Sequence, residues 1–223
     1  MKMNYISRKQ ISEVDRMAIG EFGINIMQMM ENAGRNLAEF VSKMKPKKVI
    51  VFFGGGNNGG GGLVAARHLA IREINVEIVG ASLNNNENVQ HQLKTLVKMG
   101  IKPKKDFKAK KNDIIIDALL GYNISGAPRD RFADLIKGIN FMKENGLKVV
   151  SLDIPSGVHP DKGFVFETYV KADYVLTLAL PKKGLKKLKN VYLSNIGIPK
   201  GVYKKMKIKY KNPFGDRDIV RVS

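Results

Sequence analysis

The sequence predicts an α/β protein, with a mostly parallel sheet between helices on both faces and extra helices at the N-terminus. Two observations predict this class. From residue 47 onward, short and almost wholly apolar runs alternate with stretches of helical composition, as in a parallel sheet built from right-handed crossovers. Before that point, the chain has the pattern of two helices. Since neither a repeat nor a low-complexity linker interrupts the pattern, we expect a single domain over residues 1–223.

Two helices are expected before the first strand. Ser7 or Ser12 is a suitable N-cap for the first helix, because a serine side chain accepts a hydrogen bond from the first turn. Glu13 and Asp15 are interpreted as acids near the positive end of this helix. Residues 24–44 have the three- and four-residue apolar spacing of a second helix packed on a core, at Met27, Met30, Ala33, Leu37 and Val41.

Six strands and three further helices are expected after residue 47. The strand patterns cover residues 49–53, 76–81, 113–119 and 149–154, with shorter apolar runs at 174–180 and 191–196. Helical composition covers residues 63–71, 87–99 and 129–144. In an open sheet of this kind, ligands bind beyond the carboxyl ends of the strands. The residues that directly follow the strands are therefore the candidate site residues.

Composition and charge limit the classes of function. The chain has no cysteine, which excludes disulfides, thiolate metal sites and cysteine nucleophiles. Its formal net charge of +19 favours anionic ligands. The lysines are dispersed and not interleaved with aromatic residues, so nucleic-acid binding is possible but not favoured. No apolar run approaches the roughly 20 residues of a membrane span, and the polar N-terminus does not resemble a signal sequence, so we expect a cytoplasmic protein without a membrane partner.

A glycine-rich loop follows the first predicted strand. Residues 54–62 contain seven glycines and the pair Asn57-Asn58, and a helical pattern comes next. Glycines let the backbone approach a ligand closely, and free N–H groups at the start of a helix favour a phosphate. A tight connection without a ligand is the alternative, but it needs fewer glycines. We therefore expect a nucleotide-sized, phosphate-bearing ligand at this loop.

Two standard nucleotide sites do not fit this loop. Gly54, Gly56 and Gly59 formally match G-x-G-x-x-G, but no acid ends the second strand to bind a ribose, and Glu77 lies too early. The loop also lacks the Gly-Lys-Ser/Thr ending of a P-loop. An ordinary dehydrogenase and a P-loop nucleotide triphosphatase are therefore both disfavoured.

Aspartates end two further predicted strands. Asp117 follows three isoleucines and precedes a glycine-containing segment, residues 118–127, and an acid in such a place needs a partner or a cation. Asp153 ends another strand, shortly before Ser156. With Asn58 nearby, these residues would form an oxygen-rich site for a hard cation, with one carboxylate left for chemistry. Taken alone, Ser156 is explained equally well as a turn or capping residue.

Histidine and serine chemistry is not supported by the sequence. His68, His91 and His159 show neither metal-ligand spacing with acids nor the pattern of a catalytic triad. His68 is interpreted as a structural residue. Ser156 does not stand in a G-x-S-x-G elbow, so serine hydrolysis is not indicated.

Taken together, these stretches resemble one known family, the NAD(P)HX epimerases, also called the YjeF N-terminal domain family. The matching segments run in order over nearly the full chain: Gly23-Ile24, Met30-Glu31-Asn32-Ala33-Gly34, Gly56-Asn57-Asn58-Gly59-Gly60, Asp117-Ala118-Leu119-Leu120-Gly121, Asp153-Ile154-Pro155-Ser156-Gly157 and Ile196-Gly197-Ile198-Pro199. The resemblance implies a Rossmann-like three-layer sandwich, commonly a homodimer. It also implies interconversion of the R and S epimers of hydrated NADH and NADPH, with a separate ATP- or ADP-dependent dehydratase acting downstream.

The resemblance further implies which residues form the site. Asn58, Asp117 and Ser156 match positions that bind a potassium ion. Positions that contact the substrate, NADHX or NADPHX, are matched by Asn57, Asn58, Gly59, Gly60, Gly61, Gly121, Tyr122, Asn123, Ile124, Ser125, Gly126, Ala127 and Asp153. The chain departs from the family at one position, because Gly61 stands where the family loop Asn-Asn-Gly-Gly-Asp-Gly has its aspartate.

The chemistry of such a substrate requires proton transfer. Its ring carbon carries a hydroxyl beside a nitrogen whose lone pair can expel it, and water can then return to either face. A carboxyl group near that hydroxyl would donate and later accept the proton, and we assign this role to Asp153 as a hypothesis. The alternative is a catalytically weakened nucleotide- or RNA-binding scaffold of the same fold, which Gly61 and the high positive charge would favour.

Overall fold

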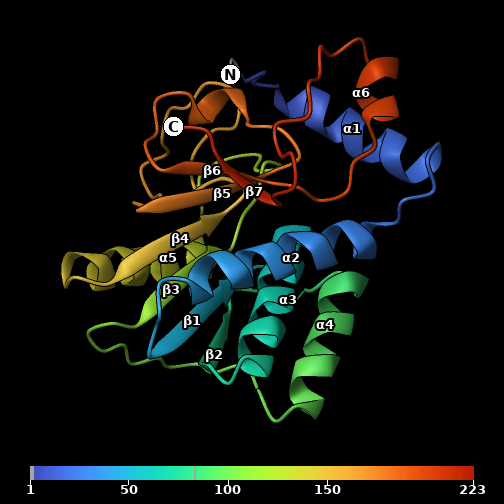
Figure 1. The fold of residues 1–223 in the computed structure, drawn as a ribbon. Helices are drawn as coiled ribbons and strands as arrows, with labels where there is room; N and C mark the ends of the chain where they lie inside the picture. The colour runs from blue at the N-terminus through green and yellow to red at the C-terminus, as the bar shows by residue number, and fades with distance from the viewer. Residues whose placement is uncertain (1–2, 83) are drawn as a thin grey trace.

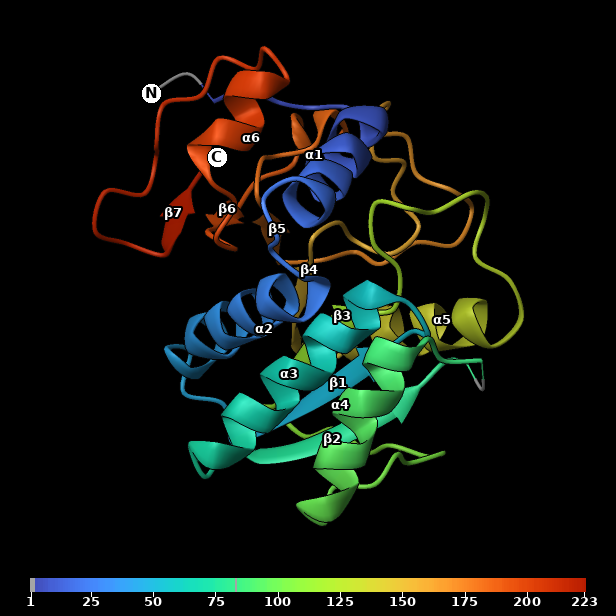
Figure 2. The same ribbon diagram turned by 90° about the vertical axis from the view of Figure 1, so that its right-hand side faces the viewer.

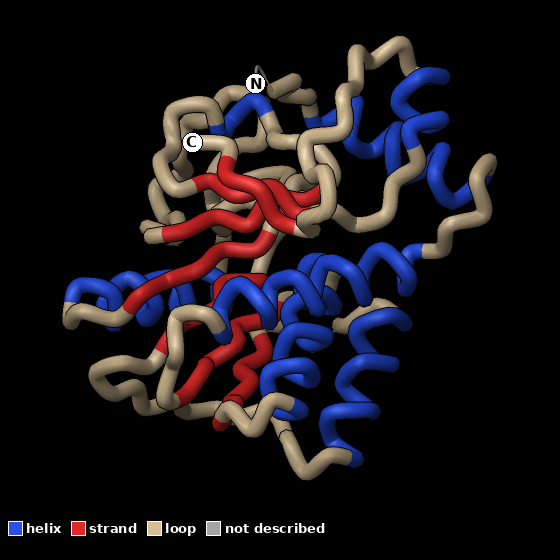
Figure 3. The backbone as a smooth tube through the Cα atoms, viewed as in Figure 1, coloured by secondary structure: helices blue, strands red, loops and turns tan. Residues whose placement is uncertain are grey.

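The computed structural model describes residues 3–82 and 84–223 as one twisted sheet with helices on both faces (Figures 1 and 3). Within these residues the sheet has seven strands in the order β2-β1-β3-β4-β5-β6-β7. Neighbouring strands from β2 to β6 are parallel, and β7 runs antiparallel to β6. The strands are β1 (Lys48–Phe53), β2 (Asn75–Gly80), β3 (Ile114–Ala118), β4 (Lys148–Leu152), β5 (Tyr174–Leu178), β6 (Val191–Ser194) and β7 (Ile219–Arg221).

Two hydrophobic clusters lie on opposite faces of the sheet. The helices are α1 (Arg8–Gly20), α2 (Ile26–Ser42), α3 (Asn57–Ile71), α4 (Glu87–Lys98), α5 (Asp130–Glu144), α6 (Lys200–Lys205) and the short 3₁₀ helix η1 (Lys183–Leu185). α2, α3 and α4 cover one face, and α5 covers the other (Figure 2). Side chains alternate along β1, so Val49 and Val51 pack toward α2 and α3, whereas Ile50 and Phe52 pack toward α5.

The N-terminal helix α1 packs against the C-terminal part of the chain rather than against the central strands. A separate hydrophobic cluster joins it to α6, with Val14 and Tyr203 among its buried members. Ser7 caps α1 in a reciprocal capping box with Gln10, so Ser7 and not Ser12 is the N-cap. The segment before α1 is tied to the region after β5, where Ile6 bridges to Lys182. This arrangement carries α1 over the carboxyl ends of the strands.

The predicted fold class is confirmed, with corrections at several boundaries. α3 begins at Asn57 and not at residue 63, because the second half of the glycine loop is helical. The close packing of this helix explains several of the glycines: a Cβ on Gly60 would lie 2.6 Å from Met30 Sδ, and one on Gly62 would lie 2.5 Å from Ala118 Cβ. α2 begins at Ile26, two residues later than expected, since Asn25 is its N-cap. The short elements α6, β7 and η1 were not predicted.

Candidate functional site

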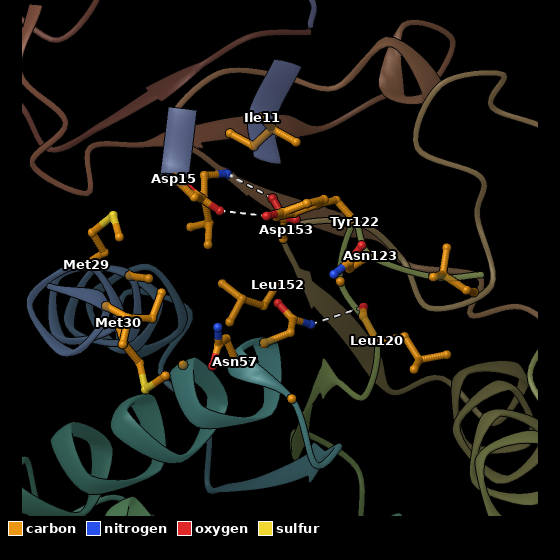
Figure 4. A pocket seen from close by; sticks show the side chains of 18 of the residues that line it. Ile11, Asp15, Met29, Met30, Asn57, Leu120, Tyr122, Asn123, Leu152 and Asp153 are labelled. Carbon is orange, nitrogen blue, oxygen red and sulfur yellow. Dashed lines mark hydrogen bonds between the residues drawn. The ribbon is translucent and has the colours of Figure 1, made fainter. Parts of the chain in front are cut away.

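One cavity of about 420 Å³ lies at the carboxyl ends of β1, β3 and β4. α1 and α2 form its opposite wall (Figure 4). Its apolar lining includes Met29, Leu119, Leu152 and Ile196. Polar side chains enter it from six separate parts of the chain, namely Asp15, Asn57, Asn58, Asn86, Tyr122, Asn123, Asp153 and Lys182. A mixed lining of this kind suits a ligand with both apolar rings and polar groups.

The glycine loop contributes only some of its predicted residues to the cavity surface. Asn57, Asn58 and Gly61 line the cavity, together with Gly55 and Gly56. Gly59 and Gly60 do not line it. A Cβ on Gly59 would collide with the carbonyl oxygen of Gly54, so this glycine is required for packing within the loop. The abundance of glycine here therefore has a packing cause as well as a proposed role in ligand approach.

The segment after β3 is held over the cavity by Arg8. Gly121, Tyr122, Asn123 and Ile124 line the cavity, whereas Ser125, Gly126 and Ala127 do not. The Arg8 guanidinium donates through Nη1 to the carbonyl oxygen of Ile124 at 2.8 Å and through Nη2 to Asn123 Oδ1 at 2.8 Å. The backbone N–H of Arg8 donates to Asp161 Oδ1 at 2.6 Å. Arg8 thus joins the start of α1 to this segment, a role that no pattern in the sequence indicates.

Asp117 lies behind the cavity in a buried hydrogen-bond network with Ser156. Its carboxylate accepts hydrogen bonds from Ser156 Oγ at 2.6 Å, Ser151 Oγ at 2.7 Å and the backbone N–H of Ser156 at 2.9 Å. Burial raises the pKa of Asp117 above its ordinary value, and these hydrogen bonds oppose the rise. Asn58 reaches the same place, since its Nδ2 donates to the carbonyl oxygen of Leu120 at 3.1 Å and the N–H of Leu120 donates to Ser156 Oγ at 2.9 Å. The three residues predicted to bind a cation therefore meet around Leu120.

Asp153 belongs to a different network, centred on Lys182. The Lys182 ammonium donates to Asp153 Oδ1 and to the carbonyl oxygen of Leu178, the latter at 2.9 Å. The backbone N–H of Leu178 also donates to Asp153 Oδ1, at 3.3 Å. Asp153 has a positive φ of 67°, which non-glycine residues adopt rarely and mostly where the surroundings enforce it. The two aspartates thus have separate partners: serines surround Asp117, and a lysine pairs with Asp153.

Two cavity residues, Lys182 and Asp15, were missed in the sequence. Lys182 begins one of the lysine-rich stretches, and its position directly after Pro181 and β5 was the only available signal. Glu13 and Asp15 were interpreted only as acids near the positive end of the first helix, which is wrong, because α1 begins at Arg8 and has no acid in its first turn. In the structure, the Tyr122 hydroxyl donates to Asp15 Oδ2 at 2.6 Å. Burial is the main cause that raises the pKa of both Asp15 and Tyr122.

His68 lies outside the cavity and has structural partners. Its Nε2 is 2.6 Å from Glu31 Oε1, and Arg67 donates to the other oxygen of the same carboxylate at 2.5 Å. This places His68 in a link between α2 and α3, as its interpretation as a structural residue requires. Across residues 3–82 and 84–223, no group of three or more histidine, cysteine, aspartate or glutamate side chains is arranged to hold a metal ion.

Comparison with known proteins gives consistent matches over most of the chain. Residues 26–184 match the family described as YjeF-related protein N-terminus. The NAD(P)H-hydrate epimerase of Dehalogenimonas lykanthroporepellens is 39% identical over 222 residues, which cover 95% of this chain and 89% of that protein. The NAD(P)H-hydrate epimerase of Entamoeba histolytica is 31% identical over 203 residues, which cover 88% of this chain and 90% of that protein.

Two further matches describe a longer relative and the fold. The bifunctional NAD(P)H-hydrate repair enzyme Nnr of Methanopyrus kandleri is 36% identical over 184 residues, which cover 77% of this chain but only 37% of that protein. The crystal structure of yeast ynu0 matches with a TM-score of 0.87 and 24% identity, covering 99% of this chain and 100% of that chain. The structural match supports the α/β fold with a mostly parallel sheet.

Proposed function

Because the chain belongs to the YjeF-related N-terminal family, we propose that it is an isomerase that interconverts the R and S epimers of hydrated NADH and NADPH. The observation that carries this proposal is the cavity at the carboxyl ends of the strands, which polar and apolar side chains line together. The asparagines of the glycine loop and the segment Gly121–Ile124 line this cavity, which supports the proposal that they contact the nucleotide part of the substrate. Asp153 lies in the same cavity and supplies a carboxylate for the reacting ring.

The cavity contains the groups that this epimerisation requires. When the hydroxyl leaves the ring carbon, the ring nitrogen becomes an iminium cation, and a nearby carboxylate stabilises that positive charge. Asp153 provides this charge, and Lys182 holds the carboxylate in place. The carboxylate also accepts a proton from water that returns to the ring. Apolar side chains such as Leu119 and Leu152 limit the water around the ring.

A potassium ion is the proposed cofactor, held by Asn58, Asp117 and Ser156. These residues fit a hard monovalent cation, because their donor atoms are a carboxylate, a hydroxyl and an amide oxygen. Asp117 is completely buried and forms no ion pair with any lysine, arginine or histidine in the described part of the chain, so its charge is free to be balanced by a cation. When bound, such an ion would supply positive charge and fix the segment after β3 against the glycine loop.

The proposal includes partners and a location. We propose that a separate dehydratase acts on one of the two epimers, because several relatives are bifunctional repair enzymes. A homodimer is proposed on the resemblance, and a cytoplasmic location on the composition of the sequence. In the described residues, no helix has the length and apolar character needed to span a membrane.

Epimer interconversion is the direct test. The purified protein is mixed with a single NADHX epimer, with and without potassium, and the approach to the epimer mixture is followed by chromatography against the spontaneous rate. Acceleration that depends on potassium supports both the activity and the cofactor. No acceleration, together with saturable nucleotide binding, would instead support the scaffold function. Salt-dependent retention on RNA or heparin then separates a nucleic-acid scaffold from a nucleotide-binding one.

A further inference from the structure

Asp15 is a second carboxyl group in the cavity, and it comes from the element opposite the strand ends. It projects from α1, whereas Asp153 follows β4, and the two lie near each other beside Tyr122 (Figure 4). The Tyr122 hydroxyl is its one side-chain hydrogen-bond partner among the described residues, with 2.6 Å between the oxygens. Asp15 forms no ion pair in that part of the chain, although Lys182 lies close enough to affect it. No basic side chain in the described part of the chain therefore pairs with the Asp15 carboxyl group.

The two carboxyl groups have opposite environments. Asp153 pairs directly with the Lys182 ammonium, a contact that Asp15 does not make among the described residues. For Asp15, burial is the main cause that raises the pKa; the nearby Asp153 charge adds to the rise, and Tyr122 and Lys182 oppose it. Tyr203 of α6 is a further titratable group close enough to interact with Asp15. Two carboxyls with such different environments in one cavity are typical of an acid and a base that work together.

We propose that Asp15 is a catalytic residue of the epimerisation, donating the proton to the departing hydroxyl while Asp153 accepts the proton from the returning water. This inference rests on the proposed function and adds to it, because the activity alone does not identify the proton donor. It also narrows the earlier hypothesis for Asp153, which keeps the acceptor half of the role.

The proposed reaction needs only the substrate, water and the two carboxyl groups. The bond between the ring carbon and its hydroxyl oxygen breaks, the electron pair leaves with the oxygen, and the Asp15 proton converts it to water. The ring nitrogen lone pair forms the iminium bond. Water then attacks the same carbon, and one of its protons passes to Asp153. Asp15 has then lost a proton and Asp153 has gained one. In the reverse reaction Asp153 donates and Asp15 accepts. Exchange with solvent returns the proton to Asp15.

The substitution Asp15→Asn tests this role, with Glu13→Gln as the matched control. Glu13 lies on the same helix with an exposed side chain that pairs with Arg16. We expect Asp15→Asn to lower kcat about 10²–10⁴-fold, as for the loss of a general acid, while the dissociation constant for NADH as a probe changes less than about threefold. Glu13→Gln should leave both constants unchanged. Thermal unfolding of each variant establishes that it is folded.

Different results separate the two proposals. If the wild-type protein does not accelerate the reaction, the proposed function fails. If the wild type is active and Asp15→Asn keeps its kcat, or loses only affinity, the assignment of Asp15 is overturned while the function stands.

The pH profile provides a second test that a purely structural role would not satisfy. Activity requires one proton on the carboxyl pair, so the wild-type rate should fall as pH rises through the pKa of Asp15. Tyr122→Phe removes the hydroxyl that stabilises the ionised Asp15, so it should move this fall to higher pH. In Asp15→Asn, the residual rate above the spontaneous reaction should lack this fall. The proposal would be contradicted if the rate of both Tyr122→Phe and Asp15→Asn fell at the same pH as that of the wild type.

Discussion

Lys182 and Asp153 form an ion pair inside the cavity wall, where their side chains are only 1% and 4% exposed. The two residues lie 29 positions apart in the chain, one after β4 and the other after β5. The ammonium has a second acceptor in the carbonyl oxygen of Leu178 at 2.9 Å. Withdrawing both charges from water is costly, and only the geometry of the pair offsets that cost. The pair therefore determines the position of the carboxylate more than it adds to stability.

Removing one partner of this ion pair should destabilise the protein by more than the pair as a whole contributes to the free energy of unfolding. We expect Lys182→Met to lower the free energy of unfolding by about 3–5 kcal/mol, because it leaves the Asp153 charge buried without a partner. Asp153→Asn should have a similar effect through the unpaired ammonium. The double variant should lose less than the sum of the two single losses. Urea unfolding of all four proteins gives the coupling energy.

Lys183→Met is the control for this cycle, since Lys183 is adjacent and exposed. It should change the free energy of unfolding by less than about 0.5 kcal/mol. Strictly additive losses in the cycle would show that the two buried side chains do not interact.

Gly61 is the position where a carboxylate should improve the site. Gly61 lines the cavity, and an added Cβ would lie 2.9 Å from Leu152 Cδ2, the flexible end of a side chain that can shift. We expect Gly61→Asp to improve substrate affinity or turnover about two- to tenfold, which corresponds to one hydrogen bond of roughly 0.5–1.5 kcal/mol. Gly61→Asn is the matched control for shape without charge. Steady-state kinetics on a single epimer measures the change, and a variant no better than wild type would rule out this position.

Arg8 should control how well the segment after β3 binds the substrate. Arg8→Met removes the hydrogen bonds to Asn123 and Ile124, so the segment must be ordered by the ligand itself. Since these hydrogen bonds are partly exposed to solvent, we expect a loss of roughly 1 kcal/mol, or about fivefold in affinity, with kcat little changed. Titration with NADH measures the affinity. Lys9→Met on the same helix is the control, and equal effects of the two substitutions would contradict a specific role for Arg8.

Asp15 should make the protein less stable as pH rises, whereas a salt-bridged aspartate makes a protein more stable as pH rises. Its pKa is raised in the folded protein, so its contribution to stability is fully present below the ordinary aspartate pKa of about 3.9. That contribution is lost as pH rises through the folded pKa. Asp15→Asn lacks this loss, so its stability relative to wild type should increase from pH 4 to pH 7. Urea unfolding across this range measures the difference, and a decrease would show that Asp15 is stabilised as a carboxylate.

The sequence was sufficient for the parts of the site that follow strands. Asn58, Asp117 and Asp153 were identifiable because a polar residue at the end of an apolar run must lie at the carboxyl edge of a parallel sheet. Lys182 and Asp15 were not identifiable in this way. A lysine among many lysines and an acid on an amphipathic helix both have ordinary surface explanations. Only the packing of α1 over the strand ends brings these two side chains into the cavity.

The sequence pattern was also insufficient to explain every loop glycine and to predict the last elements of the fold. The sequence indicated close approach at the glycine loop but not what approaches it. At Gly60 and Gly62, the structure shows side chains of Met30 and Ala118 in contact distance, where a ligand was expected. α6 has six residues and β7 has three, too few to show a period in the sequence.

The contact between α1 and α6 has a consequence for the order of folding during synthesis. α1 emerges from the ribosome before the strands, yet most of the buried side chains that pack against it lie after residue 178. At typical elongation rates of roughly 5–20 residues per second, α1 waits on the order of 10–40 s for its partner. The sheet from β1 to β4 is available earlier. The cavity wall that α1 forms is therefore completed only after the segments beyond β5 have been made.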